Sequence, residues 1–217
     1  MTQELEHGVH GESDLIEIAT RLACEGYWED IKQLQYVSKV FRYDEQLWDA
    51  MKDEPGSSES QRTRLMYAAR VGDMERLRFL LERGARVNKG SANGTTALMF
   101  ASLNGHLLVV RELVETGSNV NAASPNDGIS ALMLASLNGH LEVVHELAGR
   151  GANVNATTTG LGRTALMIAS LQNHLLVVQA LLYHGACKVA VSNSGKNALD
   201  YAAAGKRKEA LRALLEP

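Results

Sequence analysis

The chain has 217 residues, of which 45% are apolar and 22% are charged, and its formal net charge at pH 7 is −3. It has no apolar run near the ~18 residues of a membrane-spanning helix and no basic-then-apolar stretch at its start, so we expect neither an integral membrane protein nor a secreted one. Two cysteines cannot form a disulfide framework, which indicates a reducing compartment, the cytoplasm or the nucleus.

The first 60 residues differ in composition from the rest of the chain. They contain 5 Lys and Arg against 14 Asp and Glu, a net charge of −9, whereas residues 61–217 contain 17 against 11, a net charge of +6. We expect an acidic, disordered tail over residues 1–13 and a small helical segment over 14–52. A linker follows over 53–61, where Pro, Gly and Ser interrupt the apolar periodicity.

The segment 14–52 carries a pattern in its second half, Ile31-Lys-Gln-Leu-Gln-Tyr-Val-Ser-Lys-Val-Phe-Arg42, followed by Leu47-Trp48. This resembles the F-box, which ends in apolar-x-x-Leu-x-x-Val-Cys-Lys-x-Trp-Arg and then Leu-Trp. The alternative is a helical cap that buries its aromatic side chains against the first repeat, because about 40 residues are near the lower limit for independent folding. The F-box resemblance implies docking to a Skp1-type adaptor through Ile31, Leu34, Val37, Phe41, Leu47 and Trp48.

From residue 61 onward the sequence repeats itself. Ala97-Leu-Met-Phe-Ala-Ser-Leu-Asn-Gly-His106 returns 34 residues later as Ala131-Leu-Met-Leu-Ala-Ser-Leu-Asn-Gly-His140, and again as Ala165-Leu-Met-Ile-Ala-Ser-Leu-Gln-Asn-His174. Looser copies begin at Leu65 and Leu199. A period of this length predicts a solenoid of stacked units. We place five units at residues 62–93, 94–127, 128–161, 162–194 and 195–217.

Each unit predicts two short helices and an extended loop. A polar residue that can accept a hydrogen bond from a free helix N–H precedes the first helix, at Thr63, Thr96, Ser130, Thr164 and Asn197. A residue that enters the left-handed conformation at low cost ends it, at Gly72, Gly105, Gly139 and Asn173. An amphipathic second helix follows, as over residues 107–114, and stops at Gly84, Gly117, Gly151 and Gly185.

These units resemble the ankyrin repeat, Gly-x-Thr-Pro-Leu-His-x-Ala-Ala-x-x-Gly-His-x-x-Val-Val-x-x-Leu-Leu-x-x-Gly-Ala-x-Val-Asn, over about residues 62–217. The resemblance implies an all-α ankyrin-repeat solenoid with a small helical N-terminal segment. One departure recurs, because the family's Pro-Leu-His is Ala-Leu-Met here, at Met99, Met133 and Met167. Methionine supplies packing volume without the hydrogen bonds of histidine.

The repeated histidines are the main candidates for chemistry. His106, His140 and His174 occur once per unit, and stacked helices lie roughly 8–10 Å apart, so these side chains cannot converge on one metal ion. We expect them to be structural, bonding the loops between helices. Gly160-Leu-Gly-Arg-Thr-Ala165 falls in the repeat's own register and not after a strand, which argues against a dinucleotide site. We therefore predict no enzyme, no cofactor and no metal.

The family's recognition positions are the residue after the loop Gly and the two residues before the Gly-His pair. Leucine recurs at one of them, and we hypothesise an apolar stripe that anchors a partner segment; the alternative is that these leucines pack against neighbouring units. The predicted contact residues are Thr95, Leu103, Asn104, Ile129, Leu137, Asn138, Arg163, Leu171, Gln172 and Lys196.

Two functions of different class follow. The first is a non-catalytic scaffold, a monomer that binds a partner protein through its concave face. The second is a substrate receptor of a Skp1-cullin ubiquitin ligase, recruited through residues 14–52. A third possibility is that the basic stack binds the acidic tail within the same chain. The basic charge of the terminal units is interpreted as a solvated capping face, so no nucleic acid is expected as a partner.

Overall fold

The computed structural model describes residues 63–202 and 208–215. Within these residues the chain forms ten helices and no strand. The predicted tail, F-box-like segment and linker lie outside the described residues and stay predictions.

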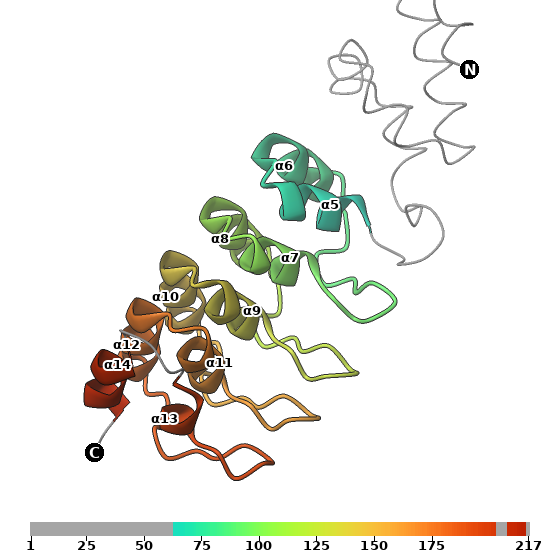
Figure 1. Cartoon of the computed structure of the whole chain (residues 1–217). Coiled ribbons are helices and arrows are strands. Elements are labelled where there is room, and N and C mark those ends of the chain that lie inside the picture. Colours follow the sequence, from blue (N-terminus) through green and yellow to red (C-terminus); the bar gives the residue numbers. More distant parts are fainter. Residues whose placement is uncertain (1–62, 203–207, 216–217) are drawn as a thin grey trace, which may run out of the picture. The chain divides into compact units, whose positions relative to one another are not determined.

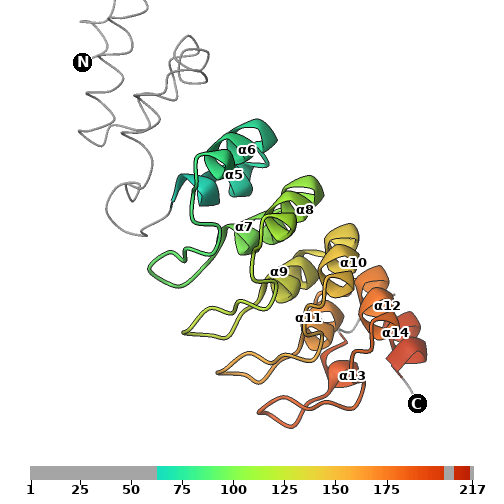
Figure 2. The ribbon, with the colours of Figure 1, turned by 180° about the vertical axis from the view of Figure 1, so that it is seen from behind.

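The ten helices form five consecutive pairs, which we call units one to five (Figure 1). The first helices make one row and the second helices another, and the loops extend on the side of the first helices (Figures 1 and 2). This confirms the predicted all-α solenoid. The pairs are α5 (Arg64–Val71) with α6 (Met74–Glu82), α7 (Ala97–Leu103) with α8 (Leu107–Glu115), α9 (Ala131–Asn138) with α10 (Leu141–Gly149), α11 (Ala165–Leu171) with α12 (Leu175–Tyr183), and α13 (Ala198–Tyr201) with α14 (Lys208–Leu215).

The first helices begin where the polar residues predicted them to begin. The hydroxyls of Thr96, Ser130 and Thr164 accept hydrogen bonds from the backbone N–H of the third helical residue, at 3.3, 3.4 and 3.3 Å. Asn197 and Asp200 cap α13 reciprocally. Each cap satisfies a helix-start N–H that has no partner inside the helix.

The core fills the space between the two rows of helices. Met99, Met133 and Met167 are at most 2% exposed, so methionine occupies the family's histidine position as packing volume. In the second helices the paired valines are buried with a leucine three residues on, as in Val109, Val110 and Leu113. Val114, the last residue of the stretch 107–114 expected to be amphipathic, is half-buried.

The recurrent histidines join each unit to the one before it. The Nε2 atoms of His106, His140 and His174 donate to backbone carbonyls of the preceding unit, each at 3.0 Å. Each ring also packs against the left-handed glycine that ends the preceding first helix. The structural role predicted for these histidines is confirmed, but their bonds go to the last turns of the preceding first helices and not to the loops.

A ladder of asparagines joins the loops, and the sequence pattern had not predicted it. The side chain of Asn121 donates to the Gly151 carbonyl at 3.0 Å and accepts from the Asn153 N–H at 2.7 Å. Asn88 and Asn155 make the same pair of bonds one unit earlier and one unit later. The ladder ends at Val189, which stands one period after Asn155 and is 79% exposed.

Ion pairs join the second helices in the same stepwise manner. Arg78 bonds Glu112 and Arg111 bonds Glu146 of the following unit, both at 2.8 Å. Arg150 adds a second bond to Glu146 at 2.9 Å. The equivalent position in α12 is Ala180, so the series of ion pairs does not continue to unit four.

Candidate functional site

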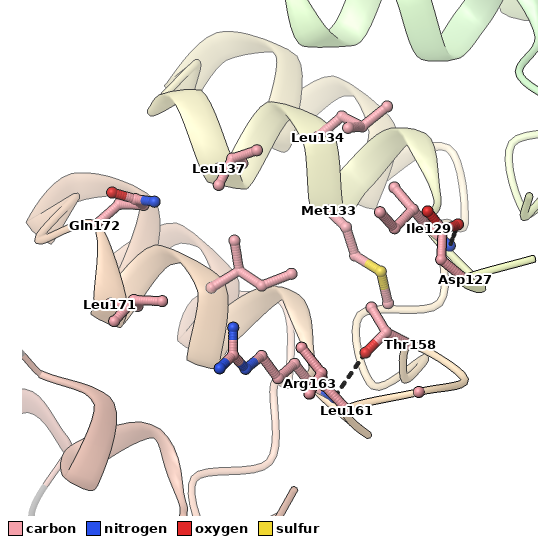
Figure 3. Close-up of a pocket in the computed structure, with 12 residues that line it drawn as sticks. Asp127, Ile129, Met133, Leu134, Leu137, Thr158, Leu161, Arg163, Leu171 and Gln172 are labelled. Carbon is pink, nitrogen blue, oxygen red and sulfur yellow. Dashed lines mark hydrogen bonds between the residues drawn. The ribbon is translucent and has the colours of Figure 1, made fainter.

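A groove of about 300 Å³ opens between units three and four (Figure 3). Its walls are the first helices α9 and α11 and the loops that lead into them. Most of the lining is aliphatic, at Ile129, Met133, Leu134, Leu137, Leu161, Ile168 and Leu171, and the rest is Asp127, Thr158, Gly160, Arg163 and Gln172.

The floor of the groove follows from the repeat. Leu134 and Leu137 lie three residues apart on α9, so they share one face of that helix. Ile168 and Leu171 are the same two positions on α11, one period later. Leu134, Leu137 and Ile168 are half-buried, whereas Leu171 is 37% exposed. Units three and four therefore present apolar side chains at equivalent positions of their first helices.

The loop before α11 contributes the exposed rim of the groove. Leu161 lies in this polar, glycine-containing loop with 56% of its surface exposed. The loop is held in place by the next one, because the Asn193 N–H donates to the Leu161 carbonyl at 3.0 Å and its side chain donates to the Gly160 carbonyl at 3.1 Å. The rim is thus fixed by a neighbouring unit.

Arg163 is the cation of the groove. Its backbone N–H donates to the Thr158 hydroxyl at 3.0 Å, and its guanidinium carbon lies 4.8 Å from the centroid of the Tyr201 ring. A guanidinium in this position is attracted to the electron-rich face of the aromatic ring. The Nε atom is buried and has no hydrogen-bond partner in the part of the chain that the structure describes.

Tyr201, which contacts Arg163, is buried in a polar cluster. Its hydroxyl lies 3.1 Å from the Ser192 hydroxyl and 3.3 Å from the Ser194 hydroxyl. These two hydroxyls and the Arg163 guanidinium stabilise the phenolate and lower the pKa of Tyr201 to about 8. The position of Arg163 is therefore coupled to the ionisation of a residue in the next unit.

The two ends of the groove differ in how their polar groups are bonded. The Asp127 carboxylate is bonded within its own loop, by the Ser124 hydroxyl and the Ile129 N–H. The Gln172 side chain makes no hydrogen bond within the described ranges, whereas its counterpart Asn138 donates to the Leu103 carbonyl at 2.7 Å. The Gln172 amide is therefore free, and Arg163 has an unpartnered Nε and no anionic partner among the described residues.

The structure brings half of the predicted contact residues together. Ile129, Leu137, Arg163, Leu171 and Gln172 all line this groove. The others lie outside it: Thr95, Leu103, Asn104 and Asn138 belong to units two and three, and Lys196 is exposed on unit five. Asn104 bonds the Phe100 carbonyl of its own helix at 2.8 Å.

The three leucines of the predicted stripe differ in exposure. Leu103 and Leu137 are half-buried and only Leu171 is exposed. The first helices of successive units pack closely, and the Asn138 side chain crosses to the Leu103 carbonyl, so the stripe is interrupted there. Sequence reasoning missed Leu134, Leu161, Ile168 and Tyr201; of these, an apolar Leu161 inside a polar loop was a signal that could have been used.

Among the described residues, two histidine side chains lie in contact outside the groove. His145 of α10 and His184 after α12 share a hydrogen bond of 3.2 Å between their rings. Burial, and then the nearby His145, lowers the pKa of His184, so His184 is neutral at pH 7. No third His, Cys, Asp or Glu joins them as a metal ligand among the described residues. In the same part of the chain, no helix is long and apolar enough to cross a bilayer.

The Tyr201 cluster makes a prediction about pH. We expect one tyrosine to ionise with a midpoint near pH 8, visible as phenolate absorbance, and this step to be absent from Tyr201→Phe. In Arg163→Gln the midpoint should move up towards the ordinary value of 10, because the guanidinium charge is gone while the serine hydroxyls remain. A step near pH 8 that persists unchanged in Arg163→Gln would contradict the contact.

The sign of the associated stability change follows from the lowered pKa. Tyr201 adds stability that is fully present above its ordinary pKa of 10 and is lost as the pH falls through about 8. Between pH 8 and 10 the free energy of unfolding of the natural protein should therefore rise relative to that of Tyr201→Phe. Urea denaturation at several pH values measures this difference.

Comparison with known proteins gives one family. The family model for ankyrin repeats (3 copies) matches residues 22–124, 65–158 and 132–217, which together contain every described residue. The first matched stretch begins inside the segment predicted to be F-box-like. A search of curated proteins finds no match.

Proposed function

The chain belongs to the ankyrin-repeat family, whose repeats are protein–protein interaction modules, and we propose that it is a non-catalytic scaffold with five repeats, one per helix pair. Its partner protein binds the face formed by the first helices and the loops, with the groove between α9 and α11 as the main contact. Solenoids present extended surfaces of this kind to their partners.

One observation carries the proposal: five residues chosen from sequence positions meet in a single apolar groove. Leu161 and Leu171 remain exposed there, although burial of a leucine side chain is worth about 1.5–3 kcal/mol. A partner side chain inserted between α9 and α11 would cover both. Exposed apolar surface bordered by polar groups is typical of interaction sites.

The groove supports binding better than catalysis. Its polar side chains are Asp127, Thr158, Arg163 and Gln172, and the Asp127 carboxylate is already bonded by its own loop. The Thr158 hydroxyl is held by the Arg163 N–H and has no base beside it in this lining. A nucleophile needs such a base to be activated. The exposed free thiol of Cys187 is consistent with a reducing location, the cytoplasm or nucleus.

The test uses a photo-crosslinking amino acid in the full chain. Placed at Gln172, at the groove, it should capture a partner in a cell lysate of the source organism; placed at Gln179, exposed on α12, it should not. Leu137→Ser together with Leu171→Ser should reduce the capture at Gln172 by at least about tenfold, because two apolar contacts are lost. A urea unfolding curve controls for folding. Equal capture from both positions, or capture unaffected by the two serines, would refute the proposal.

A second candidate is a substrate receptor of a Skp1-cullin ubiquitin ligase. It is supported by the pattern from Ile31 to Trp48 alone, and the same residues also fall within the ankyrin match that begins at residue 22. Co-expression of the full chain with a Skp1-type protein separates the two resemblances. A working F-box co-elutes, and Leu47→Ala with Trp48→Ala abolishes co-elution, whereas an ankyrin-type segment does not co-elute at all.

A further inference from the structure

We infer that the groove between α9 and α11 selects a partner segment in which a large aliphatic side chain is followed or preceded closely by Asp or Glu, whose carboxylate binds Arg163. This inference rests on the proposed function and specifies its partner. It depends on three features of the groove: an unsatisfied cation, a bonded anion and a free amide.

Arg163 has donors to offer. Its guanidinium carbon lies 4.8 Å from the centroid of the Tyr201 ring, and the group also lies within hydrogen-bonding reach of the Tyr201 hydroxyl, so Tyr201 engages only part of the donor set of Arg163. Nε is buried without a partner in the described structure, and an unpaired buried donor is unfavourable. Nε has too little exposed surface for a partner to reach, so we expect the partner carboxylate to accept a charge-assisted hydrogen bond from a terminal nitrogen of the half-buried Arg163. Figure 3 shows the Arg163 side chain extending towards α11, the helix that carries Leu171.

The anion that lines the groove does not neutralise Arg163. Asp127 is bonded to Ser124 and Ile129 within its own loop. In Figure 3, Asp127 lies beside Ile129 at the end of the groove remote from Gln172. The donors to Asp127 are uncharged, so the lining carries a negative charge at Asp127 and a positive charge at Arg163, and Arg163 has no anionic partner among the described residues. A basic partner side chain would meet like charge at Arg163, which disfavours it, while an acidic side chain gains a charge-assisted hydrogen bond.

The remaining features fit a short peptide. A volume of about 300 Å³ is at the lower limit for small-molecule pockets, and an aliphatic lining holds aliphatic side chains. The Gln172 amide supplies one acceptor and two donors, which match the N–H and C=O groups of an extended backbone. Between α7 and α9, the equivalent amide of Asn138 already donates to the Leu103 carbonyl. The space between α9 and α11 differs because the Gln172 amide is available to a ligand.

The first experiment selects binding peptides from a random library. Phage-displayed peptides of 12 random residues are selected on the natural full chain and on three variants. These are Arg163→Lys, Arg163→Glu, and the double variant Leu137→Ser, Leu171→Ser. We expect peptides with Leu, Ile or Met near Asp or Glu for the natural protein and for Arg163→Lys. For Arg163→Glu we expect Lys or Arg in place of the acid. Urea unfolding midpoints establish that each variant is folded.

The outcomes separate the two proposals. Peptides that need Leu137 and Leu171 but carry no acid, or keep the acid in Arg163→Glu, overturn the inference while leaving the scaffold function standing. Peptides that bind the double serine variant as well as the natural protein overturn the groove as a binding site, and the proposed function with it. An acid preference that reverses in Arg163→Glu supports both.

A second experiment measures the pairing directly. Two fluorescein-labelled versions of a selected peptide are titrated with the full chain. One has the selected Asp or Glu, and the other has the corresponding amide, Asn or Gln, at the same position. We expect the amide to weaken binding at least about tenfold to the natural protein and by less than about twofold to Arg163→Gln, the pattern of a direct charge-assisted pair. Equal weakening in both proteins would overturn the role of Arg163.

Discussion

Replacing Gly105 with alanine is expected to destabilise the protein by roughly 3 kcal/mol, the sum of left-handed backbone strain and overpacking. Gly105 ends α7 with φ +74°, and a Cβ added to it would lie 2.5 Å from Nδ1 of His140. That ring cannot retreat freely, because its Nε2 donates to the Leu103 carbonyl at 3.0 Å. The free energy of unfolding from urea denaturation of the full chain measures the loss.

Gly117 is the matched control. It ends α8 with φ +93°, yet nothing lies within 4 Å of an added Cβ. Gly117→Ala should therefore show only the strain of the left-handed backbone, about 1–2 kcal/mol. Measured in the background of His140→Ala, where the ring is gone, Gly105→Ala should cost no more than Gly117→Ala. If the two glycine variants are equally destabilised, His140 does not pack against Gly105 and the contact between units two and three is different from the one described.

Local chemistry explains how much of the fold was predictable. A hydroxyl before an apolar stretch satisfies a helix-start N–H whatever the rest of the chain does, and Thr96 caps α7 as expected. Asn173 stands where the other units have glycine, and asparagine is the next residue to enter the left-handed conformation, as its φ of +60° shows. Repetition then extended each local inference to the next unit. The asparagine ladder escaped prediction because its bonds join residues about 30 positions apart.

The groove was harder to predict because it depends on differences between units. Leucine recurs at positions 103, 137 and 171, and this recurrence indicated a continuous stripe. The two intervals differ in the amide beside them: Asn138 reaches the Leu103 carbonyl, whereas Gln172, one methylene longer, makes no such bond within the described residues. The Arg163 guanidinium contacts the ring of Tyr201, which lies 38 positions away in the next unit. A pattern of equivalent positions cannot show such unequal contacts.

Replacing Glu146 with glutamine is expected to lower the free energy of unfolding by about 1–2 kcal/mol, because Glu146 accepts charge-assisted bonds from two arginines. Arg111 lies at 2.8 Å and Arg150 at 2.9 Å, and the glutamate side chain is only 13% exposed. Glu115→Gln is the matched control: Glu115 bonds Arg150 at 3.2 Å with its side chain 60% exposed, so its loss should cost less than about 0.5 kcal/mol.

The pH dependence distinguishes a charge effect from a packing effect at Glu146. The hydrogen bond from Arg111, together with Arg150, holds the pKa of Glu146 below its ordinary 4.5, although partial burial acts in the opposite direction. A lowered pKa means that the carboxylate contributes stability that is fully present above about pH 4.5 and is lost as the pH falls through the folded-state pKa. The difference between the natural protein and Glu146→Gln should therefore be constant from pH 7 down to about 5 and shrink below it. A difference that persists undiminished at low pH would assign the effect to packing, and the ion pairs between the second helices would then be incidental to the stacking of units two and three.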